Sequence, residues 1–195
     1  MIVYGGDACY DKETGSRCGP ETQTRCRHAL DHIMQSHETD FIIGLMAGTP
    51  PRRPFIGPLR NLMLEFMTHE LEGCGFVQRA PFIWASPAKT VEFILATEPV
   101  YGSFEETLTF DKLLDADHAH VIAVSTDQHM KRILTGWSLV SCRSVVPYSC
   151  KYPENPYTDE WMKTLETWLF AATYHWLGEA AYQRLSDLKN KYIDH

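Results

Sequence analysis

Three polar residues follow the most continuous apolar segment of the chain at a spacing that could hold a ligand. Residues 121–125 read Val-Ile-Ala-Val-Ser, and Thr126, His129 and Arg132 come next, in a segment with helical periodicity. A strand buried on both faces has such an apolar run, and open α/β sheets bind ligands beyond the carboxyl ends of their strands. His129 and Arg132 would share one face of the first helical turns, which favour an anion. We predict a phosphate or carboxylate site with His129 as its proton-exchanging group, although a solvated helix face has the same pattern.

A glycine pair follows the first expected strand, residues 2–4. Gly5 and Gly6 could form a turn whose N–H groups make a nest for an anion, or only a tight turn. Asp7 could bind a ligand hydroxyl or a metal ion, or cap the turn. The pattern is neither a dinucleotide fingerprint nor a phosphate-binding P-loop. These three residues are therefore candidate ligand-binding residues.

Two further segments could bring charge to the same crevice. Arg25 and Arg27 lie early in the first expected helix, and either could bind a phosphate or carboxylate, or form a surface ion pair. Glu105 and Glu106 open a later helix, where they complement the helix dipole. One of the two glutamates could instead hold a ribose hydroxyl or act as a base.

Patterns for a metal site or a nucleophilic hydrolase are weak. His28 and His32 have metal-ligand spacing, but the residues between them lack the glutamate of metalloprotease motifs. His118 and His120 precede a strand and have no obvious third ligand. The chain contains no Gly-x-Ser-x-Gly motif, which disfavours hydrolases with that nucleophile. We therefore predict no bound metal.

Strands alternate with helices along the chain, and this order predicts a doubly wound, mostly parallel α/β sheet. A polar loop is expected between the first strand and the first helix. Prolines make residues 81–85 an edge strand or a loop. Strands are predicted at residues 2–4, 41–46, 91–96, 121–125 and 145–146, and helices at about 20–35, 59–71, 104–114 and 127–137.

From residue 158 the pattern changes to a long aromatic helix that carries Trp161, Trp168 and Trp176, and Gly178 could divide it in two. Such a stripe forms a core face or an oligomer surface. We expect one domain over residues 1–195, with residues 1–150 as the α/β core and residues 151–195 as a helical extension. The extension could join two copies in a homodimer.

Composition restricts the classes of partner. The net charge of −7 gives no support for nucleic-acid binding, which needs clustered Lys and Arg. No apolar stretch approaches the roughly 20 residues that span a bilayer. The first residues lack the regions of a signal peptide, so we expect a cytoplasmic protein. The six cysteines form no CxxC pair and are expected to be free thiols.

The segment after the 121–125 strand is also the most specific part of a resemblance. A valine-rich strand followed by Ser125-Thr126, a spacer, His129-Met130 and Arg132 resembles the SanA/ElyC/YdcF-like family, whose shared domain has no assigned function. The resemblance covers about residues 1–150. The other matching segments are Ile2-Val3-Tyr4-Gly5-Gly6, Arg25-x-x-x-Ala29-Leu30, the strand and turn from Phe41 to Gly48, and Glu106.

The resemblance implies a Rossmann-like sheet with a polar pocket above its carboxyl edge, and it favours Arg25 over Arg27. Members are linked to envelope biogenesis or to a nucleotide-like ligand such as S-adenosylmethionine. Two segments depart from the family: Leu62-Met63-Leu64 replaces a common Ser-Glu-Ala, and residues 101–107 keep only Glu106 of a longer polar element. We therefore expect a ligand that differs from that of better matched members.

The sequence thus predicts a protein that binds a small phosphorylated or nucleotide-like ligand. Transfer or hydrolysis at a phosphate ester is the expected reaction if the protein is an enzyme. The alternatives are a non-catalytic domain that binds a partner or itself through its aromatic helix, and an S-adenosylmethionine-binding protein or methyltransferase. The predicted catalytic residues are His129 and Glu106, and the predicted binding residues are Gly5, Gly6, Asp7, Arg25, Gly48, Ser125, Thr126 and Arg132.

Overall fold

The computed structural model describes residues 1–11, 15–46, 58–96, 103–114, 120–153 and 160–192. Within these ranges, seven strands form one sheet in the order β5-β6-β7-β4-β1-β8-β9. Neighbouring strands from β7 to β9 are parallel, as the alternation of strands and helices predicts. The parallel strands are β1 (Ile2–Tyr4), β4 (Asp40–Met46), β7 (Thr90–Leu95), β8 (His120–Thr126) and β9 (Ser144–Cys150).

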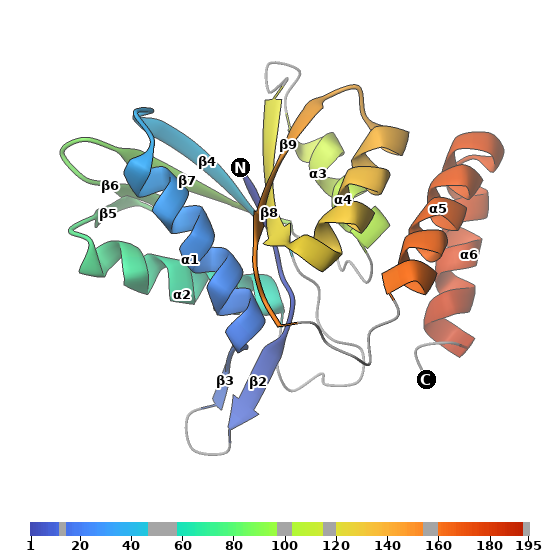
Figure 1. The fold of residues 1–195 in the computed structure, drawn as a ribbon, viewed down its shortest axis with the longest axis horizontal. Coiled ribbons are helices and arrows are strands. Elements are labelled where there is room, and N and C mark those ends of the chain that lie inside the picture. Colours follow the sequence, from blue (N-terminus) through green and yellow to red (C-terminus); the bar gives the residue numbers. More distant parts are fainter. Residues whose placement is uncertain (12–14, 47–57, 97–102, 115–119, 154–159, 193–195) are drawn as a thin grey trace.

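Helices cover both faces of this sheet (Figure 1). On one face, α1 and α2 contribute Ile33 and Met63 to a buried apolar cluster; on the other, α3 and α4 contribute Phe110 and Trp137 to a second cluster. The doubly wound, Rossmann-like α/β fold is therefore confirmed. These helices are α1 (Pro20–Gln35), α2 (Leu59–Gly73), α3 (Ser103–Leu113) and α4 (Asp127–Val140).

The strand order places a crevice at one edge of the sheet. Chain order leads from β1 to β4 and β7 on one side and then returns to β8 and β9 on the other. The direction therefore reverses between β1 and β8, and α1 and α4 leave these two strands for opposite faces. Such a switch point is where open parallel sheets bind ligands, outside the carboxyl ends of the strands.

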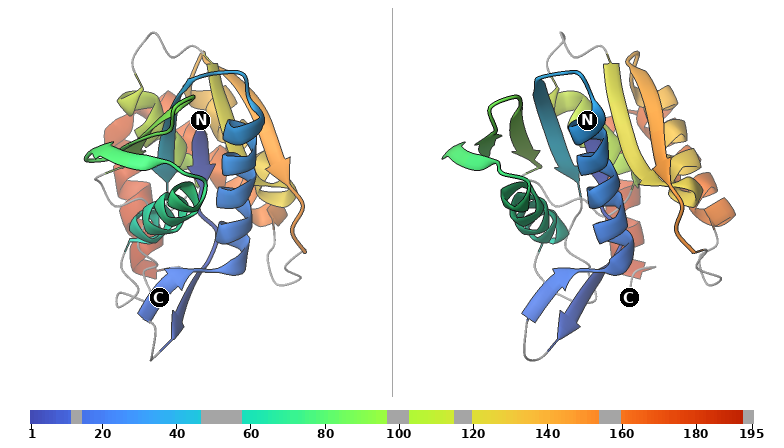
Figure 2. Two further views of the ribbon diagram at one scale, coloured as in Figure 1. Left: turned by 90° about the vertical axis from the view of Figure 1, so that its left-hand side faces the viewer. Right: turned by 60° about the vertical axis from the view of Figure 1, so that its left-hand side comes forward.

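Three of the four remaining short strands were not predicted, whereas the fourth lies in residues 81–85, which were expected to form an edge strand or a loop. β5 (Val77–Ala80) has no strong apolar pattern, yet it forms the sheet edge, and β6 (Ile83–Ala85) pairs antiparallel with both β5 and β7. The expected polar loop after β1 instead contains a hairpin, β2 (Ala8–Asp11) and β3 (Gly15–Cys18), which projects past the carboxyl edge of the sheet (Figure 2). Its two strands pair only with each other, so they needed no buried apolar face.

The aromatic C-terminal segment forms two helices, α5 (Glu160–Leu177) and α6 (Glu179–Tyr192). Gly178 separates them with a φ of 83°, a conformation that glycine adopts without steric cost. Phe170 and Tyr182 pack against Phe104 and other residues of α3 in a third apolar cluster. The extension is therefore joined to the face that α3 and α4 cover. In the part of the chain that the structure describes, no helix is long and apolar enough to cross a bilayer.

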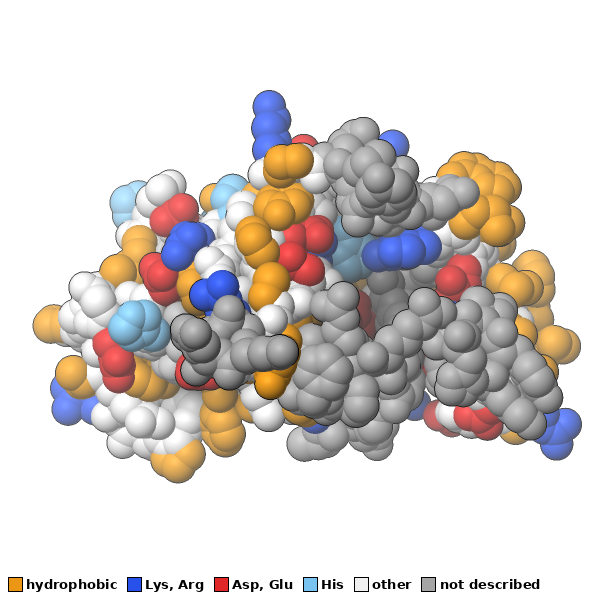
Figure 3. Space-filling view, turned by 90° about the horizontal axis from the view of Figure 1, so that it is seen from below, with side chains coloured by type: hydrophobic (Ala, Val, Ile, Leu, Met, Phe, Trp, Pro, Cys, Tyr) orange, Lys and Arg blue, Asp and Glu red, His pale blue; other side chains and the backbone are white. Residues whose placement is uncertain are grey.

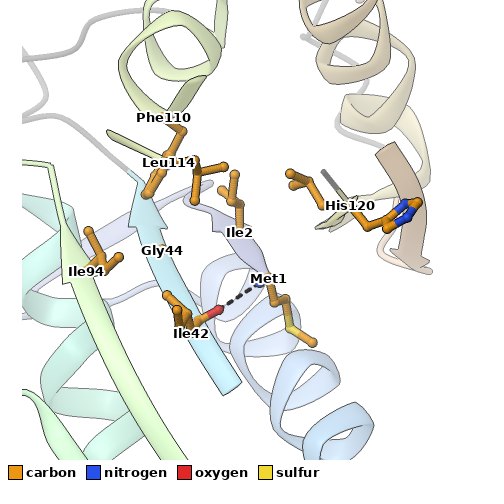
Figure 4. A pocket seen from close by; sticks show the side chains of 9 residues that line it. Met1, Ile2, Ile42, Gly44, Ile94, Phe110, Leu114 and His120 are labelled. Atoms are coloured by element: carbon orange, nitrogen blue, oxygen red, sulfur yellow. Dashed lines mark hydrogen bonds between the residues drawn. The ribbon is translucent and has the colours of Figure 1, made fainter. Parts of the chain in front are cut away.

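Close packing at the opposite, amino edge leaves a cavity of only about 30 Å³ (Figure 4). The amino group of Met1 donates a hydrogen bond to the carbonyl of Ile42 at 2.7 Å on its border. Phe110 lies over Gly44 at the centre of β4, where a larger residue would meet the ring. This edge is therefore filled by side chains, in contrast to the carboxyl edge.

We predict that Gly44→Ala destabilises the fold by about 1–3 kcal/mol, because α3 cannot move away without breaking the core. A Cβ atom on Gly44 would lie 2.3 Å from ring atoms of Phe110, which is fully buried. Urea unfolding would measure the change. Gly73→Ala is the control, since an added Cβ there would meet no described atom within 4 Å apart from its chain neighbours and the nearby backbone of its own helix. Equal effects of the two substitutions would contradict this packing.

Candidate functional site

The carboxyl ends of β1 and β8 open into a cavity of about 250 Å³, which we call the edge pocket. It lies at the switch point between the two strands, and most of the predicted binding residues line it. The described lining residues are Gly5, Gly6, Asp7, Glu21, Arg25, Thr126, Gln128, His129, Arg132, Tyr152, Pro153 and Lys163.

Hydrogen bonds of Thr22 connect the turn after β1 to the start of α1. Its hydroxyl accepts hydrogen bonds from the N–H groups of Gly6 at 2.9 Å and Asp7 at 2.8 Å, and donates to the carbonyl of Asp7 at 2.7 Å. The carboxylate of Asp7 accepts the Thr22 N–H at 2.9 Å and so caps the helix. The Gly5 N–H donates to the carbonyl of Met46 at 2.8 Å.

These contacts correct the predicted anion nest, because protein acceptors already occupy the N–H groups of Gly5, Gly6 and Asp7. The two glycines form part of the pocket wall, and Asp7 caps α1. A Cβ atom at Gly19 would lie 2.2 Å from the Asp7 carboxylate. A glycine at position 19 therefore allows the cap to approach the helix.

Arg25 links the ends of β1 and β8, and only 2% of its surface is exposed. Its Nη1 donates to the carbonyls of Tyr4 at 3.0 Å and Gly5 at 2.5 Å. Its Nη2 donates to the hydroxyl of Thr126 at 3.1 Å and to the carboxylate of Glu21, one helical turn earlier. The Thr126 hydroxyl donates to Glu21 at 3.2 Å. Arg25 therefore lines the edge pocket, and its positive charge is paired with the carboxylate of Glu21.

Arg27, the alternative candidate, points away from this site. Its guanidinium lies 3.3 Å from the carboxylate of Glu70 on α2 and 5.1 Å from the ring centroid of Phe66, and 55% of its side chain is exposed. The structure therefore places Arg25 in the pocket and Arg27 in a surface ion pair.

His129 lines the pocket, but it is almost completely buried. Burial lowers its pKa well below the ordinary value of 6.5, and the charges of Arg132, Arg25 and Lys163 lower it further. The ring is therefore neutral at neutral pH. Its Nδ1 lies 3.0 Å from the hydroxyl oxygen of Ser125, which is fully buried and is not a lining residue. Ser125 thus orients the imidazole, which corrects its predicted role in direct binding.

Glu106 lies on α3, buried and outside the pocket lining. Burial raises the pKa of its carboxyl group from 4.5 to about 8, although the charges of Arg132 and Arg25 oppose this shift. The nearby hydroxyl of Tyr4 accepts a hydrogen bond from Nε1 of Trp137 at 2.7 Å. At neutral pH Glu106 is therefore mostly protonated, and this argues against its predicted role as a base.

Charges of both signs border the edge pocket. Figure 3 looks onto the carboxyl edge of the molecule and shows acidic, histidine and basic side chains next to one another at its centre. The described lining contains the carboxylates of Asp7 and Glu21 and the cationic groups of Arg25, Arg132 and Lys163. A ligand in the pocket would therefore meet both hydrogen-bond acceptors and positive charge.

Several lining residues were missed by the sequence analysis. Glu21 precedes Arg25 by four residues on a helix, a spacing that favours an ion pair and could have indicated it. Tyr152 and Lys163 follow the last strand, where the sequence offers no motif. The predicted binding residue Gly48 lies outside the described residues.

Within the described ranges, no group of three or more His, Cys, Asp or Glu residues could hold a metal ion. His28 and His32 instead flank the ring of Tyr148, with ring centroids 4.1 and 4.8 Å away. His120 borders the small cavity at the amino edge, and His118 lies outside the described residues. All six cysteines are free thiols.

Comparison of the chain with protein-family models, curated proteins and solved structures found no match. The doubly wound fold hosts many unrelated functions, so the fold alone does not specify one. Function is therefore inferred from the residues of the edge pocket and their chemistry.

We predict that Glu106→Gln stabilises the protein by up to about 3 kcal/mol at pH 7. The folded state keeps a proton on Glu106 up to about pH 8, whereas the unfolded state releases it above pH 4.5. Below pH 4.5 both states are protonated and the free energy of unfolding is unaffected by Glu106. Between pH 4.5 and 8 the free energy of unfolding falls by up to about 1.4 kcal/mol per pH unit, because only the folded state holds the proton. Glutamine is neutral throughout and removes this loss.

Urea unfolding at several pH values between 5 and 8 would test this prediction. Glu92→Gln is the matched control, because it makes the same chemical change at an exposed position of β7. If the two variants show the same pH dependence of unfolding free energy, Glu106 is ionised in the folded protein.

Proposed function

We propose that this protein binds a small phosphorylated or nucleotide-like anion in the edge pocket. The observation that carries the proposal is the first turn of α4, which opens into a cavity that also contains Arg132. Thr126 is the N-cap residue of α4, and its own side chain forms no cap hydrogen bond. The N–H groups of such a turn carry partial positive charge and favour an anion.

The electrostatics of His129 support an anionic ligand. Three cationic side chains, Arg132, Arg25 and Lys163, each lower the pKa of this imidazole. A group whose protonation is opposed by its neighbours lies in a positive potential, and the same potential attracts a negative ligand. The pocket therefore favours an anion even though the whole chain has a net charge of −7.

Transfer or hydrolysis of a phosphate ester is the reaction that this arrangement fits. A bound phosphate would raise the pKa of His129, because a nearby negative charge favours the protonated ring. The imidazole could then accept a proton from an attacking water or alcohol while Arg132 stabilises charge on the phosphate oxygens. As the new P–O bond forms, the P–O bond of the ester breaks, and the proton returns from His129 to the departing alcohol oxygen. Glu106 lies outside the described lining, so it takes no part in this scheme. The resemblance of residues 1–150 to the SanA/ElyC/YdcF-like family supports the same position for the ligand.

A thermal-shift panel of phosphate esters, nucleotides and S-adenosylmethionine tests the proposal, because a ligand of the native state raises its apparent stability. We expect Arg132→Ala to weaken binding of the stabilising anion about tenfold or more, since a charge-assisted hydrogen bond is lost. His129→Ala should keep binding within about threefold and abolish turnover if the protein is an enzyme.

The control for both variants is Arg79→Ala, which removes an exposed cation from β5, far along the sheet from the edge pocket. The proposal is wrong if no anion stabilises the protein, or if Arg132→Ala and Arg79→Ala have the same effect. Selective stabilisation by S-adenosylmethionine would instead support the alternative ligand.

The outer face of α5 favours a second candidate function, self-association. Residues 161, 165, 168, 169 and 176 recur at helical spacing, on the side opposite the buried Phe170 and Thr167. An aromatic side chain has about 150–250 Å² of surface. Three tryptophans that are 49–73% exposed, together with their apolar neighbours, therefore approach the roughly 800 Å² per partner of a stable interface. The large exposed side chains are Trp161, Met162, Leu165, Trp168, Leu169, Trp176 and Leu177.

We predict that the protein is a dimer, with a mass in solution twice the 22.3 kDa of the chain. Trp161→Asp combined with Trp168→Asp should produce a monomer, because charges would be buried in an apolar interface. Light scattering after gel filtration measures the mass. Val77→Asp, at an exposed apolar position of β5, is the control and should leave the dimer intact. A monomeric unmodified protein would exclude this function.

A further inference from the structure

The edge pocket contains a cationic residue from the C-terminal extension. Lys163 lies in the first turn of α5 and lines the pocket, although every other described cation there comes from α1 or α4. Its charge acts on the buried ring of His129. Lys163, Thr167 and Phe170 follow one another at helical spacing, and the last two are buried. The apolar contacts of Phe170 therefore hold the helix face that carries Lys163 against the pocket.

The described charges of the pocket are separated by element. The carboxylates of Asp7 and Glu21 come from the β1 turn and α1, whereas Arg132 and Lys163 come from α4 and α5. Arg25 lies with the acidic side, because it pairs with Glu21. At the centre of the face in Figure 3, a histidine lies between acidic and basic side chains. The pocket therefore has an acidic side and a basic side.

The acidic side can accept hydrogen bonds from a ligand. One carboxylate oxygen of Asp7 accepts the Thr22 N–H, and one oxygen of Glu21 accepts the guanidinium of Arg25 and the hydroxyl of Thr126. An ionised carboxylate has about four acceptor positions on two oxygens, so these contacts do not exhaust it. Ligand hydroxyl groups are donors that fit this side, whereas a second anionic group would be repelled.

The size and polarity of the pocket restrict the ligand further. Its volume of about 250 Å³ is below the range of roughly 300–1,000 Å³ that is typical of sites for drug-sized ligands. Among the described lining residues, charged and polar side chains predominate, and Tyr152 and Pro153 are the exceptions with large apolar surfaces. A compact ligand with several hydroxyl groups fits this lining better than one with a large apolar base.

We propose that the ligand is a small sugar phosphate or a similar polyhydroxylated phosphate. Its phosphate binds Arg132 and Lys163, and its hydroxyl groups face Asp7 and Glu21. This inference rests on the proposed function and adds two things to it: the chemical class of the ligand, and Lys163 as a binding residue supplied by the extension.

Isothermal titration calorimetry with four probes tests the ligand class on the unmodified protein. Ribose 5-phosphate carries both groups, methyl phosphate carries the anion alone, ribose carries the hydroxyls alone, and adenosine monophosphate adds a base. We expect ribose 5-phosphate to bind about tenfold or more tightly than methyl phosphate or ribose, because both sides of the pocket are used. Equal binding of methyl phosphate, or tighter binding of adenosine monophosphate, would overturn the proposed class.

The role of Lys163 is tested by Lys163→Glu against Lys131→Glu. Both residues are exposed and both substitutions change the net charge by the same amount, but Lys131 on α4 is not a lining residue. We expect Lys163→Glu to weaken ribose 5-phosphate and methyl phosphate alike, by about tenfold, and Lys131→Glu by less than about twofold. Circular dichroism checks that each variant is folded.

The outcomes separate this inference from the proposed function. If the anionic probes bind and Arg132→Ala weakens them, but Lys163→Glu acts like Lys131→Glu, Lys163 does not bind the ligand and the proposed function stands. If none of the three anionic probes binds, the proposed function itself fails.

Discussion

The buried guanidinium of Arg25 is the interaction on which the carboxyl edge depends. It joins the carbonyls at the end of β1 to the hydroxyl of Thr126 at the end of β8, two strands that lie on either side of the switch point. A buried charge is tolerated when a counter-charge and hydrogen bonds compensate its desolvation, and Glu21 supplies the counter-charge. The turn after β1 is fixed in the same way by Thr22 and Asp7. These contacts fix the turn after β1, the start of α1 and the end of β8, which together carry about half of the described pocket residues.

Several groups around the pocket reduce the stability of the fold. Burial raises the pKa of Glu106 and lowers the pKa of His129, which shows that removing these two groups from water costs free energy. The Nε atom of Arg25 is buried without a described hydrogen-bond partner. Apolar residues in these positions could be buried without this desolvation free energy, as the side chains around Phe110 are at the amino edge. Perturbed titratable groups concentrated at one switch point are typical of functional sites, which supports the choice of this edge.

The sequence predicted the elements whose burial imposes an apolar pattern and missed those without such a pattern. The apolar runs of β4 and β8 and the periodicity of α1 identified the core, because burial imposes those patterns. The β2–β3 hairpin and β5 carry no such constraint, and their sequences resemble loops. In the candidate site, the motif at positions 126, 129 and 132 indicated three residues that line the same cavity. It could not show that protein acceptors occupy the amides of Gly5 and Gly6. These acceptors are the carbonyl of Met46 and the hydroxyl of Thr22, which are both distant in the chain.

The boundary at residue 150, which the resemblance suggested, does not divide the edge pocket. Tyr152 and Lys163 lie beyond it and line the same cavity as residues of β1, α1 and α4. Phe170 and Tyr182 bury apolar surface against Phe104 on α3, so the position of α5 depends on the core that it completes. A motif in sequence records only residues that are close in the chain, whereas a pocket collects residues that are close in space. The extension is therefore part of the candidate site and must be present in any protein used to study it.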